Sequence, residues 1–508
     1  GILYLYPRAG QNPNDVTIKG KRSDFAFSFD DCEYVTLEGI DFFATTVHFN
    51  GVKSGRVESC NFYYPSYSKR MLKDIGHIPH TSMIQKSISS ELLNSFPENL
   101  PKTANIFINN FVSKCDGMGL EMTTGVYDSI VNNEFEYIDI SGTQGGSQGV
   151  DYRKGYRTHF IRNTLRRCGS SAATKSSKRP INILNDFSEW GYLQGDGSGF
   201  QVAGGGQEGS LTQQNWLHDT KKSGMRFDGD PDVKKDEDTL KLAEGSFTRN
   251  VVWNNPLGYM VKGNFHRLYN NVAFNNNKQS MRVMGELGNE RANTSTETKN
   301  NVLDDLSGNR NGNFLTSHIP GDTASNWVGK TYNYTVEHVL RDPQNLDFRP
   351  KKPGTYGDLL INKGVHHEAD STRYAKYFYE STTHGFSVGL PDIGAYEYNS
   401  SSYWIPGKQK SVPARPVPLD GTTTAKADLD LMWLKPYGSD TNDLSTIYIG
   451  TSFSNMVPLS ATTQFNIAYN SDLKAALDIQ AFDPSQEYFW NCLVYTSPSP
   501  RDKRQSRM

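Results

Sequence analysis

Residues 108–111 read Ile108-Asn109-Asn110-Phe111, and the same pattern of apolar residues leading into an asparagine returns further along the chain. The last asparagines of these repeats are separated by intervals of 23, 30, 52, 35, 21 and 30 residues. The shortest intervals are close to the ~20–25 residues of one solenoid turn, and the longer ones are a turn plus an inserted loop. The repeats end at Asn110, Asn133, Asn163, Asn215, Asn250, Asn271 and Asn301. The pattern therefore predicts an all-β fold, a parallel β-solenoid.

The repeated asparagine has a structural explanation. Asparagine tolerates a left-handed backbone at a sharp bend, and its amide can bond its counterpart in the next turn. We therefore interpret it as part of the scaffold. Two weaker turns precede it, Val35–Ile40 and Gly55–Phe62, with Gly39 and Asn61 expected at the asparagine position. Between Pro65 and Pro101 we expect an insertion with a helix around Ser90–Ser95.

The composition excludes several classes of protein. Hydrophobic residues make up only 36%, but the net charge of −2 and the 12% aromatic residues argue against a disordered chain. No basic stripe indicates nucleic acid as a partner, and no apolar run of about 18 residues predicts a membrane span. The five cysteines show no metal-binding spacing, and a Cys115–Cys168 disulfide is not expected because another turn separates them.

We predict four regions along the chain. The solenoid occupies residues 1–398, a Ser- and Pro-rich linker 399–412, and a second module 413–491. This module resembles a truncated fibronectin type III domain, a small β-sandwich, because a Trp lies on an early strand and a Tyr-x-Trp strand comes near its end. Residues 492–508 do not continue that pattern and look like translated adapter sequence, so we expect a non-native tail. We also expect the natural N-terminus, with any signal peptide, to lie upstream.

A second recurring element, Gly-apolar-x-apolar, lies upstream of each asparagine. Its period of two predicts strands whose alternate residues face inward. The residues expected inside are Leu120, Val150, Phe200, Met225, Tyr259 and Met281. The residues expected outside form two columns, the first being Glu121, Asp151, Gln201, Arg226, Met260 and Arg282, and the second Thr123, Arg153, Ala203, Asp228, Lys262 and Met284.

Stacked turns lie about 4.8 Å apart, so Glu121 should neighbour Asp151, and Asp228 should face Lys262. Acids and cations concentrated on one sheet face suit binding of a polar polymer, although a solvated face with cross-strand ion pairs is the simpler alternative. The loop 230–244 could wall a groove beside this face. We expect substrate contacts from Glu121, Arg153, Gln201, His218, Asp219 and Arg282.

Residues 1–398 resemble the right-handed parallel β-helix superfamily, the pectate-lyase-like fold. The resemblance lies in Asn215-Trp216-Leu217-His218-Asp219, Arg226-Phe227-Asp228-Gly229, Asn250-Val251-Val252-Trp253-Asn254 and the segment from Lys262-Gly263 to Asn270-Asn271. It implies a role in polysaccharide breakdown and a secreted, cell-surface or periplasmic location. The fold alone does not choose between lyases, hydrolases, epimerases and binding proteins.

A lyase acting on an acidic, uronate or sulfated, polysaccharide is the favoured hypothesis. β-Elimination needs a base and a cation that neutralises the substrate carboxylate. Lys262 is the candidate base, Arg226 the neutralising cation and His266 a helper, with Asp228 and Asp151 completing the catalytic set. Lyases of the alginate and chondroitin type in this fold use a Lys and an Arg on adjacent turns, the Lys first, whereas here Arg226 precedes Lys262 and the Arg-His-Gly pattern is absent. No cofactor is assigned, Ca²⁺ remains possible, and a monomer is expected.

Two alternatives stay open. A glycoside hydrolase would use two carboxylates from Glu121, Asp151, Asp196 and Asp228, although the Asn-x-Asp and Asp-Asp pattern of pectin hydrolases is not found. A non-catalytic binding protein would hold glycan on aromatic residues, for which the candidates are Tyr152, Trp190, Tyr192 and Trp216.

Overall fold

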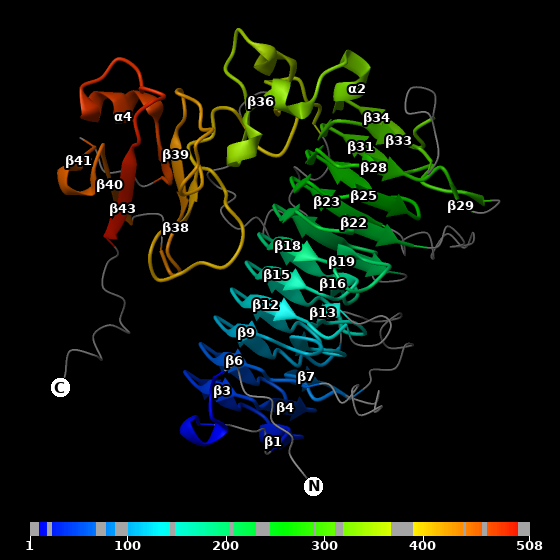
Figure 1. The fold of residues 1–508 in the computed structure, drawn as a ribbon. Coiled ribbons are helices and arrows are strands. Elements are labelled where there is room, and N and C mark those ends of the chain that lie inside the picture. The colour runs from blue at the N-terminus through cyan, green and yellow to red at the C-terminus, as the bar shows by residue number, and fades with distance from the viewer. Residues whose placement is uncertain are drawn as a thin grey trace.

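The chain winds into a solenoid in which each turn adds one strand to each of three parallel sheets of eleven strands (Figure 1). The computed structural model describes residues 10–17, 23–67, 78–86, 100–142, 148–203, 207–229, 244–287, 290–309, 318–366, 390–439, 443–459 and 465–495. The predicted all-β fold, a parallel β-helix, is confirmed. The helix expected around 90–95, most of the loop 230–244 and residues 496–508 lie outside the described residues.

Sheet 1 carries the strands that contain the Gly-apolar-x-apolar element. Its order follows the chain and is parallel throughout. Its strands are β1 (Phe25–Asp30), β4 (Thr46–Asn50), β7 (Ser82–Ile84), β10 (Leu120–Glu121), β13 (Gln148–Asp151), β16 (Ala172–Lys175), β19 (Ser198–Ala203), β22 (Ser223–Asp228), β25 (Leu257–Lys262), β28 (Gln279–Val283) and β33 (Leu306–Ser307).

Sheet 2 and sheet 3 are built from shorter strands. Those of sheet 2 are β2 (Thr36–Glu38), β5 (Arg56–Glu58), β8 (Ile106–Ile108), β11 (Ser129–Val131), β14 (His159–Ile161), β17 (Ile181–Ile183), β20 (Ser210–Gln213), β23 (Gly245–Thr248), β26 (Arg267–Tyr269), β31 (Glu297–Lys299) and β34 (Asp322–Ala324). Those of sheet 3 are β3 (Asp41–Phe43), β6 (Asn61–Tyr63), β9 (Phe111–Ser113), β12 (Glu134–Ile138), β15 (Thr164–Cys168), β18 (Asp186–Trp190), β21 (Trp216–His218), β24 (Val251–Trp253), β27 (Val272–Phe274), β32 (Val302–Leu303) and β35 (Trp327–Val328).

The asparagines form a buried hydrogen-bonded ladder at the corner between sheets 2 and 3. The backbone N–H of Asn133 donates to Asn163 Oδ1 at 3.0 Å, and the Asn133 side-chain amide donates to the same oxygen at 3.0 Å. The same pair of bonds repeats from turn to turn. The complete ladder is Asn110, Asn133, Asn163, Asn185, Asn215, Asn250, Asn271, Asn301 and Asn326. The predicted stacking of asparagines is confirmed.

Two details of the prediction were wrong. The left-handed residue at the bend is the one before each ladder asparagine, such as Arg162 with φ 55° or Leu184 with φ 57°. The interval of 52 residues hides a complete turn, whose asparagine is Asn185. Ile183-Leu184-Asn185 fits the same pattern as the other repeats, and this turn was overlooked.

In the upstream turn, Cys60 rather than Asn61 occupies the ladder position. The Cys60 N–H donates to Asn110 Oδ1 at 2.9 Å, while Asn61 pairs with Phe111 as the first residue of β6. Gly39 takes the left-handed position of its own turn, with φ 69°. A residue without a side-chain amide can thus end the ladder, because the N–H that it must present belongs to the backbone.

The solenoid interior is a continuous apolar core. All six residues predicted to face inward from sheet 1 are fully buried: Leu120, Val150, Phe200, Met225, Tyr259 and Met281. The glycine that begins many of these strands has a steric cause. A Cβ on Gly224 would lie 2.5 Å from Val252 Cγ1 and 2.7 Å from the carbonyl oxygen of Gly258 in the next turn. Strand and core therefore approach too closely for any side chain there.

After the last turn the chain forms a cap of short elements and then returns along the solenoid. The cap contains α2 (Gly329–Tyr332), η6 (Val336–His338), β36 (Leu340–Asp342), η7 (Pro343–Asn345), β37 (Asp347–Pro350) and η8 (Tyr356–Leu359). The segment expected as a linker lies against the solenoid. Trp404 is buried, the Gly407 N–H donates to the Leu184 carbonyl at 2.7 Å, and the Gln409 N–H donates to Asn132 Oδ1.

The C-terminal module consists of two antiparallel three-stranded sheets. One contains β38 (Ala414–Val417), β39 (Leu431–Leu434) and β42 (Ile467–Ala468), and the other β41 (Val457–Pro458), β40 (Leu444–Gly450) and β43 (Phe489–Tyr495), with η10 (Phe453–Asn455) and α4 (Asn470–Leu477) between strands. Strand β39 is buried on both faces. Leu431 and Trp433 pack in the module, whereas Met432 and Leu434 join an apolar cluster with the solenoid.

This shared cluster fixes the module to sheets 2 and 3, beside the solenoid and away from sheet 1 (Figure 1). It includes Trp216 and Trp253 of sheet 3, Ile161 and Leu211 of sheet 2, and Val417 of the module. Sheet 1 is thus left as the long face that the module does not cover. Within the described residues, no helix is long and apolar enough to cross a membrane.

Candidate functional site

The first outward column of sheet 1 has the predicted register, with one residue added. Glu121 pairs with Asp151, and Gln201 pairs with Arg226. Strand β16, which the sequence analysis did not predict, inserts Lys175 between Asp151 and Gln201. The column therefore reads Glu121, Asp151, Lys175, Gln201, Arg226, Met260 and Arg282. Five consecutive turns place charged or amide side chains on one face.

Asp228 is the centre of a compact ionic cluster on β22 and β25. Its Oδ1 accepts from Lys262 Nζ at 2.7 Å, and its Oδ2 contacts Arg226 Nη2 at 2.7 Å. The expected pairing of Asp228 with Lys262 is therefore confirmed. Burial alone would raise the pKa of Asp228, but its bonds to Lys262 and Arg226 outweigh burial and lower the pKa below its ordinary value. Asp228 is consequently a carboxylate at neutral pH.

Asp196 and Gln201 complete the cluster from neighbouring elements. Asp196 lies on the loop between β18 and β19, and its Oδ1 accepts from Arg226 Nη1 at 2.8 Å. Gln201 Nε2 donates to Asp228 Oδ2 at 3.2 Å. The Arg226 guanidinium is thus held between two carboxylates, with its side chain only 10% exposed and that of Asp196 87% exposed. A substrate anion could exchange with the exposed Asp196 without disturbing Asp228.

Lys175 is the functional candidate that sequence reasoning missed. Burial lowers the pKa of its amine below the ordinary value, and the nearby charge of Arg153 lowers it further, against the opposing effects of Asp151, Asp196 and Asp228. These influences locate Lys175 within electrostatic reach of the Asp228 cluster. The strand was overlooked because Ala172-Ala173-Thr174-Lys175 lacks the initial glycine and the large apolar residues of the other sheet 1 strands.

The acids at the other end of the column are tightly paired. Asp151 is buried and accepts from Arg153 Nη2 at 2.7 Å, from Arg153 Nε at 3.0 Å and from Gln148 Nε2 at 2.5 Å. Glu121 accepts from His80 Nε2 at 2.7 Å and from Thr123 at 3.2 Å. Arg153 is exposed and remains the group at this end that could meet an anionic ligand. Arg282 hydrogen-bonds Gln279 on its own strand.

His266 lies inside the solenoid instead of on the sheet 1 face. Its ring is fully buried and stacks on Phe227 with centroids 4.3 Å apart. The Gly245 N–H donates to Nδ1 at 3.2 Å, so Nε2 carries the proton and donates to the Lys262 carbonyl at 2.9 Å. Burial lowers the pKa of His266 to about 4, which keeps the ring neutral. Both ring nitrogens of His266 are thus hydrogen-bonded to backbone groups inside the solenoid, away from a ligand on the sheet 1 face.

His218 and Asp219 belong to a different face. They end β21 of sheet 3, where His218 Nδ1 lies 2.6 Å from Asp219 and Nε2 lies 3.3 Å from Asp186. Asp186 also contacts Arg415 of the module at 2.6 Å, and the His218 ring stacks on Trp253 at 4.2 Å. This cluster joins module to solenoid, so these residues do not reach a ligand on sheet 1.

The carboxylates on sheet 1 do not fit a calcium ion. Asp151, Asp228 and Glu121 are each hydrogen-bonded to an Arg, Lys or His side chain of the protein, whereas Ca²⁺ requires several oxygen ligands converging on one point. Within the described residues, no group of three or more His, Cys, Asp or Glu side chains is arranged to hold a metal ion.

Of the four aromatic residues considered as glycan platforms, three are core residues. Tyr152, Trp190 and Trp216 are at most 1% exposed, while Tyr192 is 49% exposed on the loop that also carries Asp196. Trp190 lies in the interior core of the solenoid, whereas Trp216 lies on the outer face of sheet 3, where Phe348 of the cap and Trp404 pack against it.

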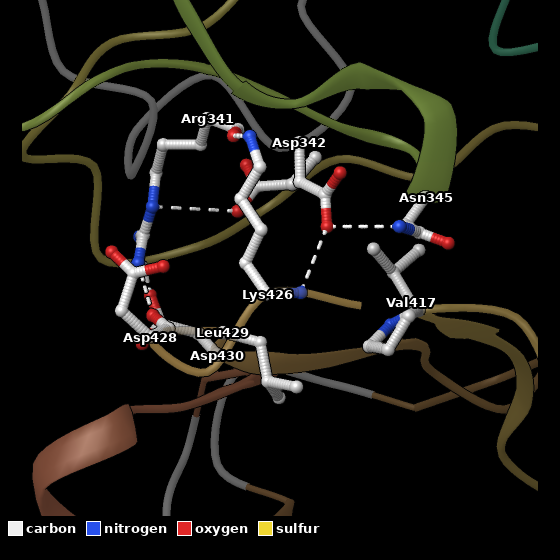
Figure 2. A pocket seen from close by; sticks show the side chains of 10 residues that line it. Arg341, Asp342, Asn345, Val417, Lys426, Asp428, Leu429 and Asp430 are labelled. Atoms are coloured by element: carbon white, nitrogen blue, oxygen red, sulfur yellow. Dashed lines mark hydrogen bonds and ion pairs between the residues drawn. The ribbon is translucent and has the colours of Figure 1, made fainter. Parts of the chain in front are cut away.

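A small pocket lies between the cap and the module (Figure 2). Its charged side chains already satisfy one another: Arg341 Nη1 donates to Asp430 at 2.6 Å, and Asn345 Nδ2 donates to Asp342 at 2.9 Å. Asp430 also accepts from the buried Arg349 at 2.9 Å. These contacts stabilise the junction between cap and module, so the pocket is not the candidate active site.

Fold and site together define a parallel β-helix protein with a polar, ionic sheet face left uncovered by its own C-terminal module. Comparison with protein-family models and with curated proteins found no match for this chain.

Proposed function

We propose that the protein cleaves an acidic polysaccharide by β-elimination on sheet 1. The observation that carries the proposal is the combination of the Arg226–Asp228–Lys262 cluster with a lysine of lowered pKa, Lys175, two turns away on the same column. Cations that bind a uronate carboxylate stabilise the charge that develops when the neighbouring carbon loses its proton. A partly buried amine is suited to take that proton.

The roles follow from the contacts. Lys175, as the neutral amine, would remove the proton from the carbon next to the carboxylate. The electron pair of that bond would form the new double bond, and the glycosidic oxygen would leave with the electrons of its bond and take up a proton from the ammonium or from water. Arg226 would bind the substrate carboxylate by exchanging Asp196, its exposed partner.

Lys262 takes an anchoring role instead of the role of base. Its amine is hydrogen-bonded to Asp228 at 2.7 Å, and removing a substrate proton would require that bond to break. Lys175 also precedes Arg226 along the solenoid, which is the order implied by the resemblance, although two turns separate them instead of one. Gln201 lies on the turn between Lys175 and Arg226, within reach of a sugar hydroxyl.

A hydrolase with Asp196 and Asp228 as its acid pair is less well supported. These two carboxylates flank one guanidinium, but a general acid needs a raised pKa, and the pKa of Asp228 is lowered. Asp228 is therefore better suited to act as a counter-ion than as a proton donor.

The test is incubation of the protein with polygalacturonate, alginate and chondroitin sulfate, recording both new double-bond absorbance and new reducing ends. We expect both signals to rise together on at least one polymer. Lys175→Ala should lower kcat by about 10²–10⁴-fold with little change in KM, the range for loss of a general base. Lys278→Ala, an exposed lysine outside the column, is the matched control and should leave kcat unchanged.

The pH profile gives a second check. Because only the neutral amine of Lys175 can act as base, kcat/KM should rise with pH through the lowered pKa of this residue and then level off. Reducing ends without double-bond absorbance would show hydrolysis, and binding without cleavage would show a glycan-binding protein. Full activity of Lys175→Ala would refute the assignment of the base.

A further inference from the structure

A row of aromatic side chains lies on the outer face of sheet 3 in the first turns of the solenoid. Phe43 of β3 pairs in register with Tyr63 of β6, and Phe111 of β9 lies beside Tyr63 with ring centroids 5.5 Å apart. Tyr64 follows at the corner toward sheet 1, 5.7 Å from Phe43. We call Phe43, Tyr63, Tyr64 and Phe111 the aromatic platform. Phe43, Tyr63 and Tyr64 are 54%, 36% and 42% exposed.

The same sheet face is occupied further along the solenoid. There Trp216, Trp253 and Phe274 are buried, and Phe348 of the cap contacts all three rings. The platform thus continues a face that elsewhere binds the protein's own aromatic segments. The return segment comes near the platform at Lys408, whose Nζ donates to the carbonyl of Asn110, the residue before Phe111, at 3.1 Å.

The chemistry of the platform favours sugar rings as its occupant. From Phe25 to Phe111, every large apolar side chain that is strongly exposed among the described residues is aromatic. Protein interfaces also bury aliphatic side chains, whereas aromatic faces with polar neighbours match the apolar faces and hydroxyl edges of sugars. The polar neighbours are present: Lys114 Nζ lies 5.1 Å from the Tyr64 ring, and Asn61 donates to Asp41 at 2.7 Å between the strands.

We propose that the aromatic platform is a second glycan-binding site, which holds a stretch of the polysaccharide outside the catalytic face. The assignment of the same polysaccharide as the ligand of the platform rests on the proposed function. The corner that carries Tyr64 borders sheet 1. On sheet 3, β9 of the platform lies four turns, or about 19 Å, before β21, and the chain runs from β21 directly into the strand that carries Arg226. A polymer held at the platform would raise the effective concentration of its own neighbouring segments at Lys175 and Arg226.

The test compares polysaccharide binding by Tyr63→Ala/Tyr64→Ala with the wild type, using affinity electrophoresis in polygalacturonate, alginate, chondroitin sulfate and a neutral glucan. We expect about tenfold weaker binding to at least one polymer, because two stacking rings are lost. Tyr332→Ala/Tyr356→Ala removes two similarly exposed rings, 51% and 43%, from the cap and should bind normally. Tyr64→Trp keeps a stacking face and should retain the affinity of the wild type.

Combination with the sheet 1 site separates this inference from the proposed function. Arg226→Ala should also weaken polymer binding. Because the sheet 1 site and the platform are far apart, the fold losses in affinity caused by Arg226→Ala and by Tyr63→Ala/Tyr64→Ala should multiply in the triple variant. Short oligosaccharides that cannot span both sites should be cleaved normally by Tyr63→Ala/Tyr64→Ala, whatever the type of cleavage. Unchanged polymer binding by this variant would overturn the inference, as would a change in its oligomeric state by light scattering, which would show that the platform contacts a second copy.

Discussion

At the scale of single residues, each corner of the asparagine ladder needs two consecutive residues with different properties, and the sequence pattern does not distinguish them. The bend needs a left-handed residue, and that position accepts Asn, Arg, Gln or Leu. The next position needs a side chain that accepts from one backbone N–H and donates to a carbonyl of another turn, which Asn meets by its length. The ladder was predictable because only the second requirement selects one amino acid. Which of the two residues takes the left-handed conformation was not predictable, because both are often Asn.

We expect Asn215→Ala to be strongly destabilising. The Asn215 amide donates to Asn250 Oδ1, to the Asn182 carbonyl and to the Gln213 carbonyl, and its Oδ1 accepts from the Asn185 N–H at 2.8 Å. Alanine leaves these buried groups unsatisfied, so the free energy of unfolding should fall by about 3 kcal/mol. Urea denaturation measures the change. Asn399→Ala, at an exposed asparagine, is the control, and an equal loss in both variants would contradict the argument.

At the scale of elements, some strands of sheet 1 can be recognised from the sequence and others cannot. Strands that begin with glycine and alternate large apolar residues were found, and their inward residues were predicted correctly. Strand β16 has neither signal, since Ala172 and Ala173 fill a narrow part of the core. Missing it removed Lys175 from the predicted site. The ionic pairing of Asp228 with Lys262 was predictable, because parallel stacking alone brings them together.

Gly224→Ala tests the steric origin of the initial glycine. A Cβ at Gly224 would clash with Val252 and with the Gly258 carbonyl of the next turn, so β22 must shift away from β25. We expect unfolding free energy to fall by about 2–3 kcal/mol, as for overpacking in a core. A Cβ at Gly195 would meet nothing within 4 Å, so Gly195→Ala should be neutral within about 0.5 kcal/mol in the same denaturation experiment.

At the scale of the whole molecule, the solenoid and module form one structure through an apolar seam. The seam could not be derived from local periodicity, because residues 399–412 have the composition of a linker while Tyr403, Trp404 and Ile405 are almost completely buried. Trp404 stacks on Tyr396 at 4.2 Å, and the Trp216 Nε1–H donates to the Tyr396 hydroxyl at 3.1 Å. The contacts that bury this segment are long-range.

Trp404→Ala should therefore destabilise solenoid and module together. We expect a loss of about 3–5 kcal/mol, typical of removing a large buried aromatic side chain. The unfolding transition followed by far-UV circular dichroism and by tryptophan fluorescence should shift by the same amount. Phe453→Ala removes a ring that is 76% exposed and should leave both curves unchanged. Separate transitions for the two probes in the wild type would contradict the idea of one cooperative structure.

The ionic cluster at the same seam predicts a pH dependence of stability. Burial opposes the His218 imidazolium, but hydrogen bonds to Asp186 and Asp219 raise the pKa of His218 to about 9. A raised pKa means that this stabilisation is complete below about pH 6.5 and is lost as pH rises toward 9. Burial would raise the pKa of Asp186, yet Arg415 and His218 lower it to about 2, so its contribution is lost only as pH falls from about 4 toward 2.

Thermal unfolding between pH 6 and 9.5 measures the His218 contribution. The wild type should lose about 2 kcal/mol across this range, and His218→Gln, which cannot titrate, should lose distinctly less. A variant with the same slope as the wild type would show that other groups cause the pH dependence.

The corner between sheets 2 and 3 contains two residues in every turn, whereas the other two corners, which flank sheet 1, vary widely in length. Because this corner is constant, whole turns of the solenoid are structurally equivalent units. A segment that begins and ends at equivalent ladder asparagines could be excised or duplicated in evolution, and the cut ends would meet in register with the ladder intact. Such a change would lengthen or shorten the sheet 1 face by about 4.8 Å per turn, and under the proposed function it would change the number of sugar units that the face spans.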